Sequence, residues 1–235
     1  MLPFIAKPLR TLWQDATGVA AVEFALAVPF LLGAGLLGLE TCNRVLVQMQ
    51  ISQIAIQVAD NASRIGDTSV LEDRKIYEDD INDLFYGAHV QTSKGLALLE
   101  HGRIILSSQQ VHPDFPERQY IDWQRCIGKK RYESSYGKEG DGLTNASFRG
   151  MGPKHEEVIA FEDDAVMFVE IAYDYQPLVG EPFSFGTHEV TAIASFTVRD
   201  DRDLGGIFQR DPTDPDEAAK CDIYGGSAYS VEAVG

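Results

Sequence analysis

The chain has 235 residues and a formal net charge of −16, a length that suffices for one ordinary domain and a membrane anchor. Two basic and two acidic residues balance within positions 1–39, so the negative excess belongs to positions 40–235. Nucleic-acid binding and docking on an anionic membrane surface both need clustered Lys and Arg side chains. The charge distribution therefore argues against both kinds of partner, while it favours the solubility of an exported domain.

An apolar segment, Val19–Leu39, contains a single charge, Glu23. As a helix, its 21 residues would extend about 32 Å, enough to cross the hydrocarbon core of a bilayer. Lys7 and Arg10 precede the segment, and positive charge collects on the cytoplasmic side of membrane spans. The sequence therefore predicts one membrane span, with the N-terminus in the cytoplasm and the rest of the chain outside.

Two other interpretations of this segment remain open. A secretory signal peptide has a basic start, a short apolar core and an exit marked by small residues. Here the apolar core is longer, and Glu23 near its start would hinder ordinary signal function. The other interpretation is a buried helix of a soluble domain.

A glycine, Gly18, immediately precedes the apolar segment, and Glu23 lies five positions after it. A carboxylate within a membrane span costs roughly 2.5–3.5 kcal/mol on insertion scales, so such residues usually have a function. The arrangement resembles the processing site of type IV prepilins. The resemblance implies that a prepilin peptidase cuts after Gly18, which makes Val19 the new N-terminus and Glu23 the fifth residue of the mature chain.

The helix is expected to continue beyond the span. Apolar residues recur at spacings of three and four, as on one face of an amphipathic helix: Val47, Ile51, Ile54, Val58, Ala62 and Ile65. Gly66 is a typical helix stop. A second helix is expected over about 69–86, where Ser69 and Glu72 form a capping-box pair.

Four strands are predicted from runs rich in β-branched and aromatic residues: Arg103–Val111, Tyr120–Ile127, Ala165–Tyr175 and His188–Arg199. Pro177 and Pro182 separate the last two, which favours an antiparallel pair. Residues 128–158 indicate a long loop, because Gly, Lys, Glu and Ser predominate there. The chain from Asp200 onward has the composition of a loop-like tail.

The expected fold class is therefore α+β, with a long N-terminal helix followed by a small antiparallel sheet. One half of that helix is transmembrane and the other half is amphipathic. The predicted segments are a leader (1–18), a transmembrane helix (19–39), an amphipathic extension (40–66) and an extracytoplasmic domain (67–235).

The chain contains three cysteines, which cannot all pair within one molecule. Cys42 follows the apolar segment and is expected near the membrane face. Cys126 and Cys221 are predicted to form a disulfide, since export would place both in an oxidising compartment. The alternative is two unrelated buried thiols.

Residues 18–32 have the sequence Gly-Val-Ala-Ala-Val-Glu-Phe-Ala-Leu-Ala-Val-Pro-Phe-Leu-Leu. This sequence resembles the N-terminal region of the TadE-like family of minor pseudopilins. Looser similarity extends to Val169–Leu178, to Ala194–Asp200 and to the regions around Cys126 and Cys221. These proteins belong to the tight-adherence (Tad, Flp-type) pilus system. The resemblance implies a minor pilin that is needed for pilus assembly, without enzymatic activity or a cofactor.

The resemblance also implies a single-pass inner-membrane protein with a periplasmic domain, and it implies partners and roles for particular residues. Gly18 and Val19 would flank the scissile bond, and Phe24 occupies a position that is often Tyr in the major Flp pilins. The expected partners are a prepilin peptidase, the major Flp pilin, other minor pseudopilins, platform proteins of the inner membrane, and membrane lipid. Glu23 could pair with the free amine of Val19 in a neighbouring subunit. Alternatively, it lies near the lipid headgroups and snorkels.

No constellation of residues points to an enzyme. The five histidines lack metal-ligand spacing, and the Gly140–Gly142 stretch lacks the remaining ligands of a calcium loop. Neither a nucleophile elbow nor a phosphate-binding loop is present in the sequence. A different class of function remains open, in which the chain is an uncleaved envelope scaffold or an adhesin-like binding module. A single-span periplasmic hydrolase would need catalytic residues that the sequence does not reveal.

Overall fold

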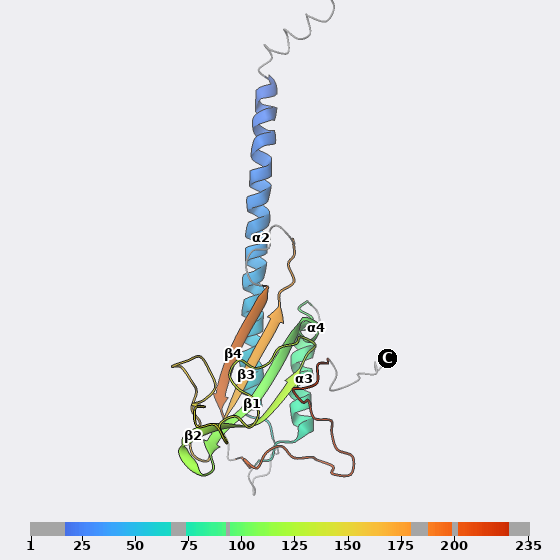
Figure 1. Cartoon of the computed structure of the whole chain (residues 1–235). Coiled ribbons are helices and arrows are strands. Elements are labelled where there is room, and N and C mark those ends of the chain that lie inside the picture. Colours follow the sequence, from blue (N-terminus) through green and yellow to red (C-terminus); the bar gives the residue numbers. More distant parts are fainter. Residues whose placement is uncertain (1–16, 67–73, 93–94, 180–187, 199–201, 226–235) are drawn as a thin grey trace, which may run out of the picture. The chain divides into compact units, whose positions relative to one another are not determined.

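The computed structural model describes residues 17–66, 74–92, 95–179, 188–198 and 202–225 (Figure 1). The elements are α2 (Thr17–Ala62), α3 (Glu78–Thr92), α4 (Leu98–His101), β1 (Gly102–His112), β2 (Phe115–Ile127), β3 (Ala165–Asp174) and β4 (Glu189–Thr197). The chain divides into two compact units: Met1–Val45 with Pro177–Gly186, and Leu46–Gln176 with Thr187–Gly235. This arrangement of one long helix followed by an antiparallel sheet confirms the α+β class.

The long helix α2 has 46 residues and contains Pro29. In the second unit, the apolar stripe predicted from the sequence is buried at Ile51, Ile54, Val58 and Ala62. The helix ends slightly before the predicted stop, and Gly66 follows with φ of +125°. A Cβ at Gly66 would lie 3.0 Å from the carbonyl oxygen of Lys75, so both the backbone conformation and the available space favour glycine at this turn.

The four strands form one antiparallel sheet with the order β2-β1-β3-β4. All four predicted strands are confirmed, including the antiparallel pairing of β3 with β4. The main difference is β2, which begins at Phe115 instead of Tyr120. The register between β1 and β2 shifts twice, next to Ser108 and next to His112. These irregularities let the hairpin extend beyond the apolar run on which the prediction was based.

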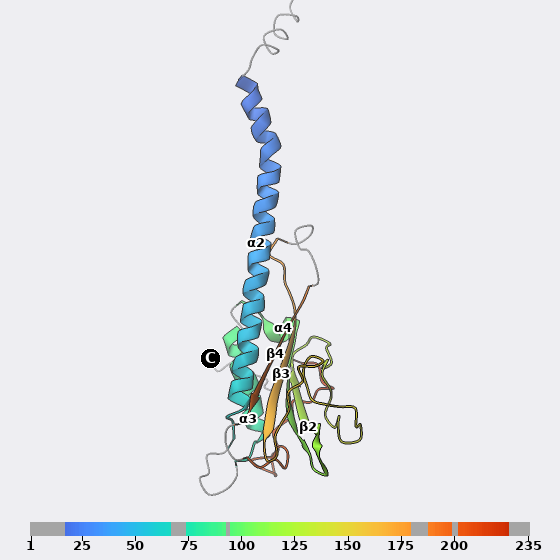
Figure 2. The same ribbon diagram turned by 90° about the vertical axis from the view of Figure 1, so that its left-hand side faces the viewer.

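In the second unit, the sheet lies between the C-terminal half of α2 and the loop formed by residues 128–158 (Figure 2). On the helix side, the core includes Ile51 and Val58 of α2, Phe85 of α3, and Leu106 and Val169 of the sheet. A smaller cluster occupies the loop side, where Tyr136, Phe148 and Val158 pack against three buried side chains: Ile121, Met151 and Phe168. The central strands β1 and β3 are thus covered on both faces.

The loop at 128–158 contains no helix or strand, as predicted, but polar side chains of the sheet hold its backbone. Gln109 donates from Nε2 to the carbonyl oxygen of Val158 (2.8 Å) and accepts from the N–H of Met151 (2.6 Å). The buried carboxylate of Glu170 accepts from the hydroxyl of Tyr132 (2.6 Å), the hydroxyl of Ser134 (2.8 Å) and the N–H of Ser135. A loop without regular structure needs such partners for its buried backbone groups.

The prediction of the second helix was partly wrong. It was expected over about 69–86, whereas α3 spans Glu78–Thr92; Ser69 and Glu72 lie outside the described residues. The helix begins later because Tyr77 pairs in an extended bridge with Phe208 of the tail. Asp80 then accepts a hydrogen bond from the N–H of Tyr77 (3.1 Å) and so caps the start of α3, where acidic side chains also suit the helix dipole. The short helix α4 was not predicted.

Candidate functional site

The N-terminal half of α2 exposes its apolar side chains. In the first unit, Val19, Phe24 and Phe30 are 54%, 69% and 78% exposed. The helix is long and apolar enough to cross a membrane, and its most apolar stretch has no buried residue. Water is a poor solvent for such a surface, so by length and composition this helix could be a single membrane span.

The residues singled out from the sequence lie in the first two turns of this helix. Gly18 follows the first residue of α2, Thr17, so the expected scissile bond is in the first turn, where the backbone N–H groups have no intrahelical acceptor. A Cβ at Gly18 would meet no described heavy atom within 4 Å. Val19 and Glu23 are four positions apart and therefore share one face of the helix. Both are exposed, as is Phe24.

A second carboxylate, Glu40, was not recognised from the sequence as a candidate. It is the first residue after the apolar span and is only 4% exposed. Its Oε2 atom accepts hydrogen bonds from the N–H groups of Leu178 and Val179, both at 3.0 Å. A charge directly after the span was visible in the sequence, but its partners lie 138 and 139 positions away. This pair of hydrogen bonds, the Glu40 clamp, joins two segments of the first unit.

The predicted disulfide between Cys126 and Cys221 is present and holds the C-terminal tail on the outer edge of β2. Arg103, a buried residue of β1, donates from Nη2 to the carbonyl oxygen of Cys221 (2.7 Å). The N–H of Cys126 donates to the carbonyl oxygen of Ala219 (2.7 Å), and the N–H of Gly128 donates to the carbonyl oxygen of Gly225 (2.9 Å). The tail thereby occupies backbone positions that a further strand would use. Cys42 is a free, exposed thiol on α2.

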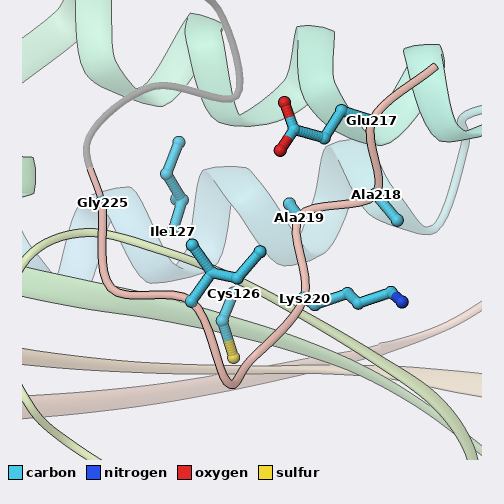
Figure 3. Close-up of a pocket in the computed structure, with 8 residues that line it drawn as sticks. Cys126, Ile127, Glu217, Ala218, Ala219, Lys220 and Gly225 are labelled. Carbon is cyan, nitrogen blue, oxygen red and sulfur yellow. The ribbon is translucent and has the colours of Figure 1, made fainter.

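The cavity beside this disulfide is too small for a ligand. Figure 3 shows Cys126 and Ile127 facing the tail segment Glu217–Lys220, with Gly225 at the other side. The cavity measures about 30 Å³, which is room for about one water molecule. It is therefore a packing gap under the tail.

A larger open cleft of about 650 Å³ lies over the same disulfide, between the tail and the loop after β2. Its charged side chains are mostly paired: Arg125 with Glu78, and Lys138 with Glu133 (2.7 Å). Tyr132 in this cleft is not a base, because burial, together with its hydrogen bond to Glu170, raises its pKa to about 12. The cleft thus presents paired charges and a protonated phenol.

Among the described residues, no group of three His, Cys, Asp or Glu side chains could hold a metal ion. The histidines lie on different elements: His89 on α3, His101 on α4, His112 on β1, His155 in the loop after β2, and His188 just before β4. Comparisons with protein-family models, with curated proteins and with solved structures gave no match for this chain.

Proposed function

We propose that this chain is a minor pilin, or pseudopilin, required for assembly of a Tad (Flp-type) pilus. It would be made as a prepilin with its N-terminus in the cytoplasm, and cut after Gly18 by a prepilin peptidase. The observation that carries the proposal is that the two halves of α2 have different surfaces. Its N-terminal half is apolar and exposed, whereas its C-terminal half supplies core side chains to an antiparallel sheet domain.

The position of Glu23 supports this proposal. After cleavage the helix would begin at Val19, whose free amine would be uncompensated in an apolar setting. Removing one partner from a buried ion pair typically costs about 3–5 kcal/mol, so a carboxylate at this depth has a strong preference for a nearby cation. Glu23 is four residues from Val19 and could meet either its own amine or that of a neighbouring subunit. Pairing between subunits would fix their axial register.

The proposed partners follow from the two halves of α2. The apolar half would pack against the corresponding helices of the major Flp pilin and other minor pseudopilins, and before assembly it would lie in membrane lipid beside the platform proteins. Gly33, Gly35 and Gly38 are small residues, which let helix backbones approach each other. Nothing within the described chain requires glycine at these positions, because a Cβ at each would meet no described heavy atom within 4 Å. In this proposal the domain has no catalytic role and needs no cofactor.

The experiment that tests the proposal is the intact mass and N-terminal sequence of the membrane-extracted protein, from cells with and without the prepilin peptidase. A mature chain that begins at Val19 only when the peptidase is present would support a pseudopilin. A chain that begins at Met1 in both strains would contradict it and leave an uncleaved membrane-anchored scaffold or adhesin. The variant Gly18→Asp is a control, since it should block cleavage at this bond without changing the sheet domain.

A further inference from the structure

We infer that the segment Pro177–Val179 is a second membrane contact of this protein, in which Leu178 enters the interfacial region of the bilayer that α2 crosses. This inference rests on the proposed membrane anchor, and it adds a lipid-binding element that is remote in sequence from the span. The partner is the outer leaflet of that bilayer, in the zone between headgroups and acyl chains.

The first observation is the position of the segment. Two N–H groups, of Leu178 and Val179, donate to Oε2 of Glu40 at 3.0 Å, and Glu40 directly follows the apolar span Val19–Leu39. Pro177–Gly186 belongs to the same compact unit as Met1–Val45. The segment is therefore fixed at the level where the span ends.

General helix geometry indicates that the Glu40 side chain, and with it the segment that it holds, lies on the membrane side of this boundary. In an α-helix the Cα–Cβ bond tilts toward the N-terminus, so a side chain covers the turn before its own Cα. For Glu40 the preceding turn includes Leu37, which is 40% exposed, and Leu39, which is 54% exposed. The carboxylate thus reaches back over the end of the apolar span and holds Leu178 there.

The second observation is the chemistry of the segment. Leu178 is 63% exposed although its backbone is held by a buried carboxylate, and Pro177–Val179 contains no charge. Apolar side chains beside a membrane span are stabilised by burial in the boundary between headgroups and acyl chains. The acidic chain, at −16, gives no attraction to anionic headgroups. The contact is therefore apolar and independent of anionic lipid.

The test uses the full chain in phosphatidylcholine vesicles, with Cys42→Ser to remove the free thiol. An environment-sensitive fluorophore is attached to one new cysteine, at Leu178→Cys, Phe30→Cys or Ile159→Cys. Lipids that carry a quencher either near the headgroup or at mid-bilayer depth are then added in separate samples. Phe30 reports the span itself. Ile159 is the matched control, because it is 60% exposed and belongs to the other unit. The Leu178 probe should be quenched at least about twofold more than the Ile159 probe, as expected for interfacial burial.

The three probes separate failure of this inference from failure of the anchor. If the Phe30 probe responds to lipid quenchers at mid-bilayer depth while the Leu178 probe matches Ile159, the membrane contact is overturned and the anchor stands. If the Phe30 probe does not respond, the anchor and this contact are both overturned. Replacing phosphatidylcholine by anionic lipid should leave the quenching of the Leu178 probe unchanged or lower.

Variants of Glu40 test its positioning role. Glu40→Ala removes the acceptor and should bring the Leu178 signal down toward that of Ile159, while Phe30 is unaffected. Glu40→Gln keeps an acceptor oxygen and should retain part of the quenching. Cooperative denaturant unfolding of each variant shows whether the sheet domain remains folded. A Leu178 probe that is quenched equally in the natural chain and in both Glu40 variants would overturn the role of the Glu40 clamp.

Discussion

The guanidinium of Arg202 donates a hydrogen bond of 2.6 Å from Nη2 to the carbonyl oxygen of Ile65, just beyond the end of α2. Nη1 lies 3.4 Å from the carbonyl oxygen of Ala62, the last residue of the helix. The final carbonyls of a helix lack intrahelical donors, and a cation there also complements the helix dipole. A buried arginine of the tail therefore completes the helix that carries the sheet domain.

Arg202→Met should lower the free energy of unfolding of the sheet domain by about 2 kcal/mol, since hydrogen bonds from charged groups contribute roughly 1.5–3 kcal/mol. Denaturant unfolding of the full chain in detergent measures this change. Arg64→Met is the matched control, because Arg64 forms an exposed pair with Asp60 at 2.7 Å, and such pairs contribute about 0.3–0.5 kcal/mol. Equal effects of the two variants would contradict the capping role.

Loss of the disulfide should be more damaging. The bond closes a separation of 95 residues, for which chain entropy accounts for roughly 4–5 kcal/mol. The double variant Cys126→Ser, Cys221→Ser should lose about this amount in denaturant unfolding. It should also make the tail from Glu217 to Lys220 sensitive to limited proteolysis. Cys42→Ser is the control, since its thiol is exposed and surface substitutions usually change stability by less than about 0.5 kcal/mol.

The pair formed by Arg125 on β2 and Glu78 on α3 is largely buried, with side chains that are 14% and 5% exposed. Nε of Arg125 donates to both carboxylate oxygens, at 3.1 and 3.0 Å. Arg125→Met should therefore cost about 3–5 kcal/mol, because it leaves Glu78 buried without its cation. The double variant with Glu78→Gln should recover part of this loss, as a double-mutant cycle would measure.

The exposed pair of Lys129 and Glu100 provides the comparison for that prediction. Its atoms are 2.7 Å apart, but its side chains are 52% and 55% exposed. Lys129→Met should change the free energy of unfolding far less than Arg125→Met does, because water screens the exposed pair. If Arg125→Met were equally mild, burial would not be what makes the Arg125–Glu78 pair important.

Asp122 should make the fold less stable as the pH rises. Burial raises its pKa above 3.8, the charge of Glu139 raises it further, and the Tyr120 hydroxyl opposes the shift. The folded state therefore keeps a proton that the unfolded chain has released, so stability falls as pH rises from 3.8 through the raised pKa. Asp122→Asn should unfold at higher denaturant than the natural chain at pH 7, and at the same denaturant at pH 3.

Asp211 should affect the pH dependence of stability in the opposite direction, and it serves as the control. Hydrogen bonds from the hydroxyl and the N–H of Thr213 lower the pKa of Asp211, so its ionised form favours the folded state above the unfolded pKa, and this contribution is lost as the pH falls. Asp211→Asn should therefore be slightly less stable than the natural chain at pH 7. The same sign for Asp122→Asn and Asp211→Asn would contradict the assignment.

Glu23→Gln should leave cleavage after Gly18 intact but reduce piliation. Loss of the carboxylate would leave the charge of the Val19 amine unpaired, which costs about 3–5 kcal/mol for a buried ion pair. A tenfold loss of assembly needs only about 1.4 kcal/mol. Intact mass reports cleavage, and electron microscopy of sheared cells reports pili. Glu117→Gln, at an exposed position of β2, is the control and should have normal pili. Normal piliation in Glu23→Gln would contradict the pairing.

The sequence was enough to predict α2 from its periodic apolar residues, and β1, β3 and β4 from their β-branched runs. This is possible because side-chain periodicity within one element reports its buried face. The first residue of α3 could not be predicted from the sequence, since it depends on the bridge between Tyr77 and Phe208. The capping signal at Ser69 and Glu72 is local, whereas that bridge joins residues far apart along the chain. The sheet side chains that hold the loop at 128–158 are also distant from it in sequence, so the composition of the loop did not predict these contacts.

Composition and short, regular spacings were enough to establish the apolar segment, the position of Gly18 and Glu23 relative to it, the α+β class, and the cysteines available for pairing. Only the folded chain shows that Glu40 holds Leu178, that Arg202 completes α2, and that the loop is ordered by side chains of the sheet. In each case a polar group has its hydrogen-bond partner far along the chain. Such donors and acceptors come within hydrogen-bonding distance only when the backbone has folded around them.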